Sequence, residues 1–272
     1  MKIGMMNDPA KNILDEITFA GENKFDFIDL TIEPPEAQIE DINVRKILSV
    51  CNRYTLGIIG HTNFYLPWAS PIKRLKKASM LELTEHLKVF SKLGVKYASI
   101  HSHWYQPRSF QEEIIERIIE SLQQIVIIAR QYGITMMLEN QPNGFLHKPE
   151  SLLPIFRNVE NLLFHLDVGH AQVAGGMKNL TREFLKLFRN KLAHIHFSDN
   201  KGKSDDHLPI GAGIVDWEDI IRQLKKIHYD KTITLEVFVK DQSYVCYSKE
   251  KIRHLWETVT IAGRKTTDKL EA

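Results

Sequence analysis

The stretch that decides the fold spans residues 162–197 and reads LLFHLDVGHAQVAGGMKNLTREFLKLFRNKLAHIHF. It begins and ends with short runs rich in Leu, Ile and Phe, which is the composition of a strand buried on both faces. Between these runs, residues 178–190 have the apolar spacing of an amphipathic helix. The order strand, helix, strand predicts two parallel strands joined by a helical crossover.

The same unit recurs along the whole chain. Apolar runs lie at residues 2–6, 25–32, 55–59, 97–100, 135–138, 162–166, 192–197 and 232–238. Helical patterns lie at residues 9–20, 36–51, 71–93, 109–132, 149–158, 178–190, 216–227 and 246–262. Eight such units predict an α/β protein, a single-domain (β/α)8 TIM barrel at residues 1–262 with a polar C-terminal tail at residues 263–272.

The rival fold is an open, doubly wound sheet. Such a sheet usually has a glycine-rich phosphate-binding turn after its first strand. In this chain the first run ends with Met6-Asn7-Asp8-Pro9, which contains no glycine. The closed barrel is therefore the better prediction.

Composition excludes several classes of protein. The chain has 36 Lys and Arg against 34 Asp and Glu, and a net charge of +2 does not favour a polyanion-binding protein. Two cysteines exclude a disulfide-stapled scaffold and a multi-cysteine zinc module. No apolar run reaches the ~18–20 residues that span a bilayer, and the start of the chain lacks a signal-peptide pattern. We therefore expect a cytoplasmic protein that binds no membrane.

Chemistry-bearing side chains gather where the predicted strands end, which is where TIM barrels place their active sites. The third to eighth strands each supply an imidazole or a carboxylate there. These residues are His61, His101, Glu139, Asp167, His196 and Glu236, and the following loops add His170, Asp205 and His207. One such residue alone is more often a structural histidine or a helix cap. Several carboxylates in one barrel mouth, however, would repel one another unless a cation neutralised them.

We assign the metal site to Glu139, Asp167, His196 and Glu236, because four adjacent strands can direct these side chains at one point. Mixed imidazole and carboxylate ligands suit Mn²⁺, Zn²⁺, Co²⁺ or Mg²⁺, and the nitrogen ligand disfavours Mg²⁺. No organic cofactor is expected. The period of two along a strand places His165 and His194 on the same faces as Asp167 and His196. We interpret both as inward packing residues or supports behind the ligands.

Four motifs, in this order, resemble the xylose isomerase-like barrels. They are His165-Leu-Asp-Val-Gly-His170, Ala193-His-Ile-His-Phe-Ser-Asp-Asn200, Asp206-His-Leu-Pro-Ile-Gly-Ala-Gly213 followed by Asp216-Trp217, and Thr234-Leu-Glu-Val237. The family includes sugar and sugar-phosphate isomerases and epimerases, and also endonuclease IV. The resemblance covers the chain from about the third strand onward. It implies a (β/α)8 barrel of a type that often forms dimers or tetramers.

In the ketose 3-epimerase branch, the resemblance implies one divalent metal held by the four assigned ligands. Glu139 and Glu236 would also act as an acid/base pair on opposite faces of the substrate, and His170 would contact sugar oxygens. The expected function is a metal-dependent isomerase or epimerase of a sugar or sugar phosphate, which moves a proton through a metal-stabilised cis-enediolate. A dehydratase built on the same enolate is a near variant.

Recognition of the small-molecule sugar is expected to involve aromatic side chains. We predict that Phe64, Trp68 and Trp104 cover the apolar face of the sugar and exclude water. The substrate-binding arginine of the epimerase branch would fall at Gly202, so this chain departs from the branch in its contacts to the sugar.

The endonuclease IV branch gives an alternative. The nine ligands of its three zinc ions have counterparts at His61, His101, Glu139, Asp167, His170, His196, Asp205, His207 and Glu236. This resemblance implies an apurinic/apyrimidinic endonuclease that hydrolyses phosphodiesters, with nucleic acid as its partner. Asp199-Asn200, Leu208-Pro209 and Asp216-Trp217 look more like the isomerase branch, and the small net charge does not suggest a duplex-binding face. A barrel that only binds a ligand does not account for the full set of acid/base carboxylates.

Overall fold

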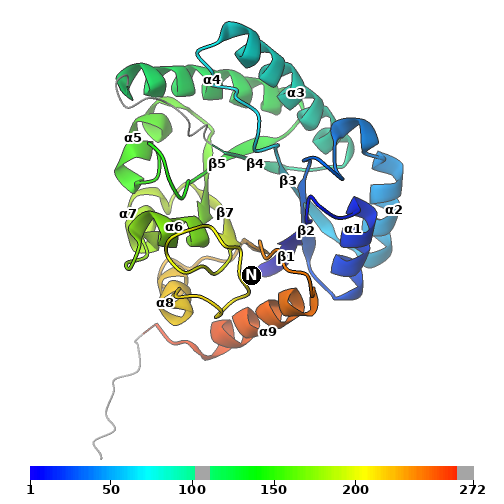
Figure 1. Ribbon diagram of the computed structural model, residues 1–272, viewed down its shortest axis with the longest axis vertical. Coiled ribbons are helices and arrows are strands. Elements are labelled where there is room, and N and C mark those ends of the chain that lie inside the picture. Colours follow the sequence, from blue (N-terminus) through cyan, green and yellow to red (C-terminus); the bar gives the residue numbers. More distant parts are fainter. Residues whose placement is uncertain (102–110, 262–272) are drawn as a thin grey trace, which may run out of the picture.

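The computed structural model describes residues 1–101 and 111–261. Its strands form a closed parallel barrel in sequential order, β1 to β8, seen from one end in Figure 1. They are β1 (Lys2–Met6), β2 (Phe27–Thr31), β3 (Gly57–His61), β4 (Tyr97–His101), β5 (Thr135–Glu139), β6 (Leu163–Asp167), β7 (Leu192–Phe197) and β8 (Thr232–Leu235). The predicted single-domain (β/α)8 barrel is confirmed, while the predicted tail at residues 263–272 lies outside the described residues.

Helices surround the barrel on its outer side (Figure 1). They are α1 (Ile13–Glu22), α2 (Val44–Tyr54), α3 (Lys73–Lys92), α4 (Gln111–Gln131), α5 (Pro149–Asn158), α6 (Val168–Gly175), α7 (Thr181–Phe188), α8 (Trp217–Lys226) and α9 (Ser243–Thr258), with a short 3-10 helix, η1 (Ile39–Asp41), before α2. None of the helices in the described part of the chain is long and apolar enough to cross a membrane.

Helix α6 was not predicted from the sequence. It begins directly after β6, because the Asp167 carboxylate accepts a hydrogen bond from the backbone N–H of His170 and so caps the first turn. A side chain assigned to the metal site therefore also starts a helix. This cap fixes where the His170 side chain leaves the backbone.

Two boundaries differ from the sequence pattern. Helix α2 starts at Val44 rather than near residue 36, because the side chain of Asn43 accepts a hydrogen bond from the N–H of Lys46. Strand β8 ends at Leu235, so Glu236 lies one residue beyond the strand. Its backbone N–H still donates to the carbonyl of Phe197, which keeps Glu236 beside β7.

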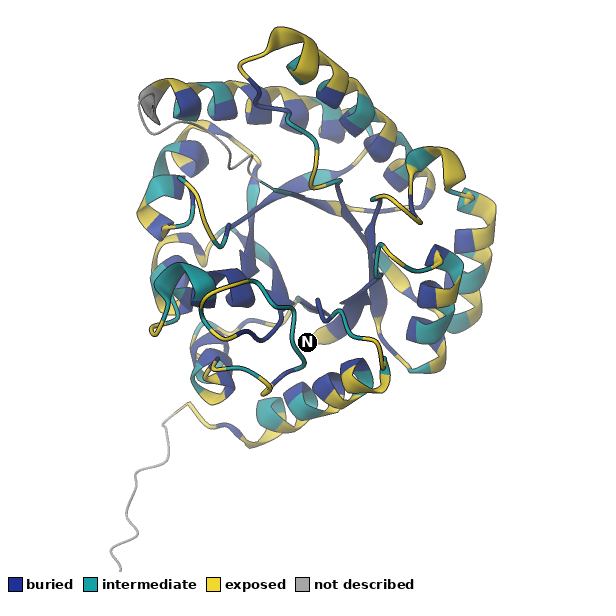
Figure 2. Ribbon diagram, in the orientation of Figure 1, coloured by how far each residue is buried: buried dark blue, intermediate teal, exposed yellow. Residues whose placement is uncertain are grey.

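The barrel interior changes from apolar to polar along its axis. Phe27, Ile59 and Met137 pack together inside the barrel. Two residues further along the same strands, Asp29, His61 and Glu139 replace them, and all three are buried. Figure 2 shows the strands buried and the helices exposed mainly on their outer faces. Because buried polar groups are costly unless they are paired, this polar layer marks the functional end of the barrel.

Candidate metal centre and active-site cavity

Four side chains converge at the carboxyl ends of β5 to β8. Glu139 and Asp167 end β5 and β6, His196 lies in β7, and Glu236 follows β8. Each offers one ligand atom, and these four atoms all lie within 4.8 Å of one another. The strand register helps, because it sets Asp167 directly beside His196 across β6 and β7. The four residues that sequence reasoning assigned to a metal therefore lie together, and all of them are buried.

The carboxylates of this group are incompletely paired. Oε1 of Glu139 and Oδ2 of Asp167 have no hydrogen-bond partner within residues 1–101 and 111–261. Burial, opposed by the imidazole of His170 and reinforced by Glu236 and Glu139, raises the pKa of Asp167 to about 7. A divalent cation would satisfy both oxygens and relieve the repulsion between the acids, so the donor set fits Mn²⁺, Zn²⁺, Co²⁺ or Mg²⁺.

Three histidines surround the other oxygen of Glu139. Its Oε2 lies 3.2 Å from Nε2 of His61, 3.0 Å from Nε2 of His101 and 3.3 Å from Nδ1 of His165. Burial alone would raise the pKa of Glu139, but His101 and His165 outweigh it and hold that pKa well below its usual value. Glu139 is therefore an ionised carboxylate. It belongs to the four-residue group, and its Oε2 also contacts the histidines of β3 and β4.

A second set of predicted residues forms its own cluster at the mouth of the barrel. Oδ2 of Asp205 is 2.9 Å from Nε2 of His170 and 3.1 Å from Nε2 of His207. Burial opposes protonation of His207, but Glu236 and Asp205 raise its pKa to about 9. The structure thus brings all nine predicted imidazoles and carboxylates to one end of the barrel.

This charge balance predicts how the metal-free protein responds to pH. His207 has a pKa of about 9 in the folded protein and ~6.5 in the unfolded chain, so protonated His207 stabilises the fold. This contribution is complete below pH ~6.5 and is lost as the pH rises through about 9. The pKa values of His61, His170 and His196 are also raised, which gives the same sign. We therefore expect Tm of chelator-treated protein to fall between pH 6.5 and 9, measured by circular dichroism.

His207→Gln is expected to make this dependence shallower. A metal-free Tm that is constant or rises between pH 6.5 and 9 would contradict the assigned charge states.

Asp199 anchors the loop that carries Asp205 and His207. Its carboxylate is fully buried and accepts hydrogen bonds from the N–H groups of Gly211 at 2.8 Å and Val215 at 3.2 Å, and from Nε1 of Trp217 at 2.9 Å. Sequence reasoning had placed Asp199 in a motif without giving it a task. Its task in the structure is to fold the β7–α8 connection back over the barrel mouth.

A cavity of about 320 Å³ opens above the converging residues. This volume lies within the ~300–1,000 Å³ of small-molecule sites. Its lining includes His61, His101, His170, Asp205, His207 and Glu236. Glu139 and Asp167 are fully buried and do not belong to the described lining. Glu236 is thus the carboxylate of the four-residue group that lines the cavity.

The predicted aromatic residues have different positions. Phe64 lines the cavity, with its ring centre 5.1 Å from that of His101. Trp68 is buried and does not appear in the described lining; its Nε1 donates to the carbonyl of His101, and its assignment to the substrate pocket stays a prediction. Trp104 lies outside the described residues. Phe238 was missed, although it lies two residues after Glu236; it lines the cavity and packs on His207.

Asp29 was also missed. It lies in the middle of β2, is fully buried, and places Oδ2 3.0 Å from Nε2 of His194 and 2.9 Å from Nε2 of His196. Burial would raise the pKa of Asp29, but these two hydrogen bonds outweigh it and hold that pKa well below its usual value. The available signal was an acid at the centre of an apolar strand.

Comparison with known proteins identifies the class of barrel. The model of the xylose isomerase-like TIM barrel family matches residues 17–258, so the chain belongs to that family. The resemblance drawn from the four motifs is therefore confirmed.

Individual relatives come from two branches of the family. A solved D-tagatose 3-epimerase-like protein is 28% identical with a TM-score of 0.85, covering 95% of this chain and 98% of its own. A probable L-ribulose-5-phosphate 3-epimerase, UlaE of Mycoplasma pneumoniae, is 20% identical over 84% of this chain and 77% of its own length. A probable endonuclease 4 of Aquifex aeolicus is 26% identical over 63% of this chain and 67% of its own length.

Proposed function

We propose that this chain is a divalent-metal-dependent isomerase or epimerase of a sugar or sugar phosphate. The observation that carries the proposal is the buried group of Glu139, Asp167, His196 and Glu236 at the base of a cavity sized for a small molecule. The likeness to proteins named as 3-epimerases supports the same class of reaction.

A divalent ion bound by these four residues would polarise a sugar carbonyl and acidify the neighbouring C–H bond. Glu236 borders the cavity and takes that proton. Burial opposes its ionisation, but His207 and His196 hold the pKa of Glu236 below its usual value, so the carboxylate is ready to accept. The substrate then becomes an enediolate.

Glu139 approaches from β5, three strands away from Glu236 along the sheet order. Glu139 returns a proton to the enediolate from a different side than Glu236. Protonation of the opposite face of the same carbon gives an epimer, and protonation of the neighbouring carbon gives an isomer. His61 lies 3.2 Å from Glu139, and despite burial the carboxylate raises the pKa of His61, which provides a proton beside Glu139. His170 orients a substrate hydroxyl, and Phe64 with Phe238 excludes water.

Proton exchange with solvent tests this proposal. Metal-loaded protein is incubated in D₂O with a panel of ketoses, aldoses and their phosphates, and deuterium at carbon is followed by NMR. We expect deuterium at the carbon next to the carbonyl of at least one sugar. Absence of exchange across the whole panel would contradict the proposal.

A second candidate function rests on the other five predicted residues. His61 and His101 contact Glu139, while His170, Asp205 and His207 form a cluster around Asp205. Nine ligands of this kind suit three metal ions, and such a cluster would hydrolyse a phosphodiester with a bridging hydroxide. The likeness to a probable endonuclease 4 supports this alternative.

Metal stoichiometry separates the two functions. For the isomerase or epimerase we expect one tightly bound equivalent by elemental analysis, and Asp205→Ala should retain it. Close to three equivalents, mainly zinc, together with cleavage of DNA containing an abasic site, would favour the endonuclease. In that case Asp205→Ala should lose one equivalent and the cleavage activity.

A further inference from the structure

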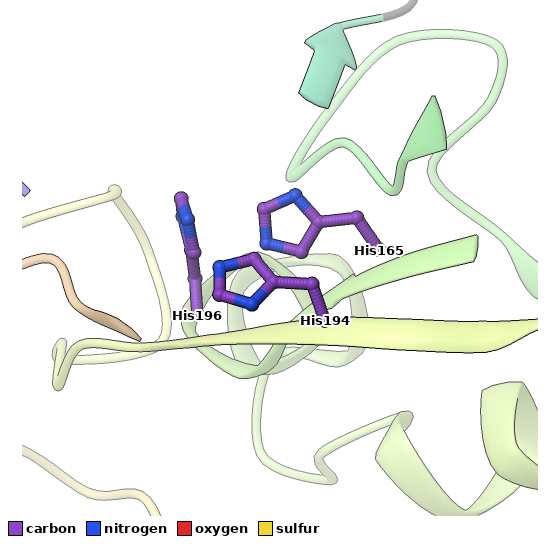
Figure 3. Close-up of side chains that lie close together, drawn as sticks. All are labelled: His165, His194 and His196. Atoms are coloured by element: carbon purple, nitrogen blue, oxygen red, sulfur yellow. The ribbon is translucent and has the colours of Figure 1, made fainter. Parts of the chain in front are cut away.

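A buried polar layer supports the four-residue group from inside the barrel. Figure 3 shows three of its members, His165 from β6 and His194 and His196 from β7, with their imidazoles close together. The centre of this layer is Oδ2 of Asp29. It lies 2.9 Å from Nε2 of His196, 3.0 Å from Nε2 of His194 and 2.9 Å from Oγ1 of Thr234, all fully buried.

The contact with Asp29 decides how His196 meets the metal site. Because Nε2–H of His196 donates to Asp29, Nδ1 is the ring nitrogen left to bind a metal. Nδ1 lies 3.0 Å from Oε2 of Glu236 and 3.8 Å from Oδ2 of Asp167, so this nitrogen faces the acids, and a bound metal would replace its proton. A histidine that donates its second N–H to a carboxylate is fixed in orientation and becomes a more basic ligand.

The three histidines of Figure 3 could instead form an ion site of their own, since their ligand atoms lie within 4.8 Å of one another. Their hydrogen bonds argue against it. Nδ1 of His194 pairs with Oγ1 of Thr232 at 2.8 Å, and its Nε2 pairs with Asp29. Nδ1 of His165 pairs with Oγ of Ser99 at 2.8 Å. An ion held by all three rings would have to break at least one of these buried bonds.

We propose that Asp29 is a positioning residue that holds His196 in the Nε2–H tautomer and directs its Nδ1 at the metal. The inference rests on the proposed metal site but concerns a residue outside it. The consequence is that a strand without any ligand, β2, controls the affinity of the site.

Asp29→Asn tests the proposal, with Thr234→Val as the matched control. Both changes remove a partner from the same buried hydrogen-bond centre, but only the first alters the acceptor for His196. Binding of Co²⁺ is measured by chelator competition and by its visible absorption spectrum. We expect Asp29→Asn to weaken Co²⁺ binding by roughly 10–100-fold and to change the spectrum. Thr234→Val should bind Co²⁺ nearly as the unaltered chain does.

A second measurement does not require a variant that folds. In the unaltered, Zn²⁺-loaded protein with ¹⁵N-labelled histidine, NMR should find the His196 proton on Nε2, because Zn²⁺ takes the place of the proton on Nδ1. A proton on Nδ1 would overturn the proposal, as would unchanged Co²⁺ affinity in Asp29→Asn. If Asp29→Asn does not fold, the NMR result decides alone.

Three outcomes separate this proposal from others. A second Co²⁺ equivalent that disappears in His194→Gln would assign the three histidines as an ion site and overturn the positioning role. If the unaltered chain binds no divalent metal, the proposed function fails together with this inference. Tight Co²⁺ binding that Asp29→Asn leaves unchanged would contradict the positioning role alone.

Discussion

Glu236→Gln will lower the rate of proton exchange at the sugar carbon by roughly 10²–10⁴-fold, the usual contribution of a positioned acid/base group. The amide has the size of the carboxylate and keeps one oxygen towards the metal, but it cannot take a proton from carbon. The rate is measured in D₂O on the best sugar of the panel. Metal is kept saturating, because Glu236 is also assigned as a ligand and its replacement will weaken metal binding.

Glu139→Gln should cause a loss of similar size, since the reaction needs both carboxylates. The control is Glu16→Gln, which changes another buried acid that lies outside the described cavity lining and bonds to Asp8 and Gln242. We expect the control to exchange at the rate of the unaltered chain. Exchange that persists at full rate in both Glu139→Gln and Glu236→Gln would remove these residues from the chemistry.

Asp199→Ala will destabilise the protein by at least about 3 kcal/mol, because it leaves several buried donors without the charged acceptor that now binds them. The affected donors are the backbone N–H groups of Asn200, Gly211 and Val215 and the indole N–H of Trp217. The free energy of unfolding is measured by urea titration of the chelator-treated protein. The same variant should also lose the arrangement of Asp205 and His207 at the cavity.

Asp206→Ala is the matched control for this effect. Asp206 lies on the same loop, and within the described residues its carboxylate bonds with nearby groups, the N–H of Lys201 and the hydroxyl of Ser204. We expect its unfolding curve to follow that of the unaltered chain. Coincident curves for Asp199→Ala and the unaltered chain would show that Asp199 does not anchor the loop.

Most of the fold could be predicted because each strand is a short apolar run and each run is followed by a helix. The exception, α6, depends on a contact that the pattern does not contain. Residues 168–175 have little amphipathic spacing, and their helix starts from a cap supplied by Asp167, whose main assignment is to the metal site. Where one side chain serves both purposes, the local pattern is a poor guide.

The site could be predicted where geometry alone brings residues together. Parallel strands end at the same edge, so Glu139, Asp167 and His196 had to lie close whatever their detailed contacts. Asp29 could not be found in this way, because its partner His196 is 167 residues away in the sequence. Nor does the sequence show that the Trp68 indole is buried and donates to the carbonyl of His101.

The most direct test of the central claim is an anomalous-diffraction map of crystals soaked in Mn²⁺. The claim predicts a strong peak within bonding distance of Glu139, Asp167, Glu236 and Nδ1 of His196. At a saturating Mn²⁺ concentration, a map with no peak among these four residues would contradict it.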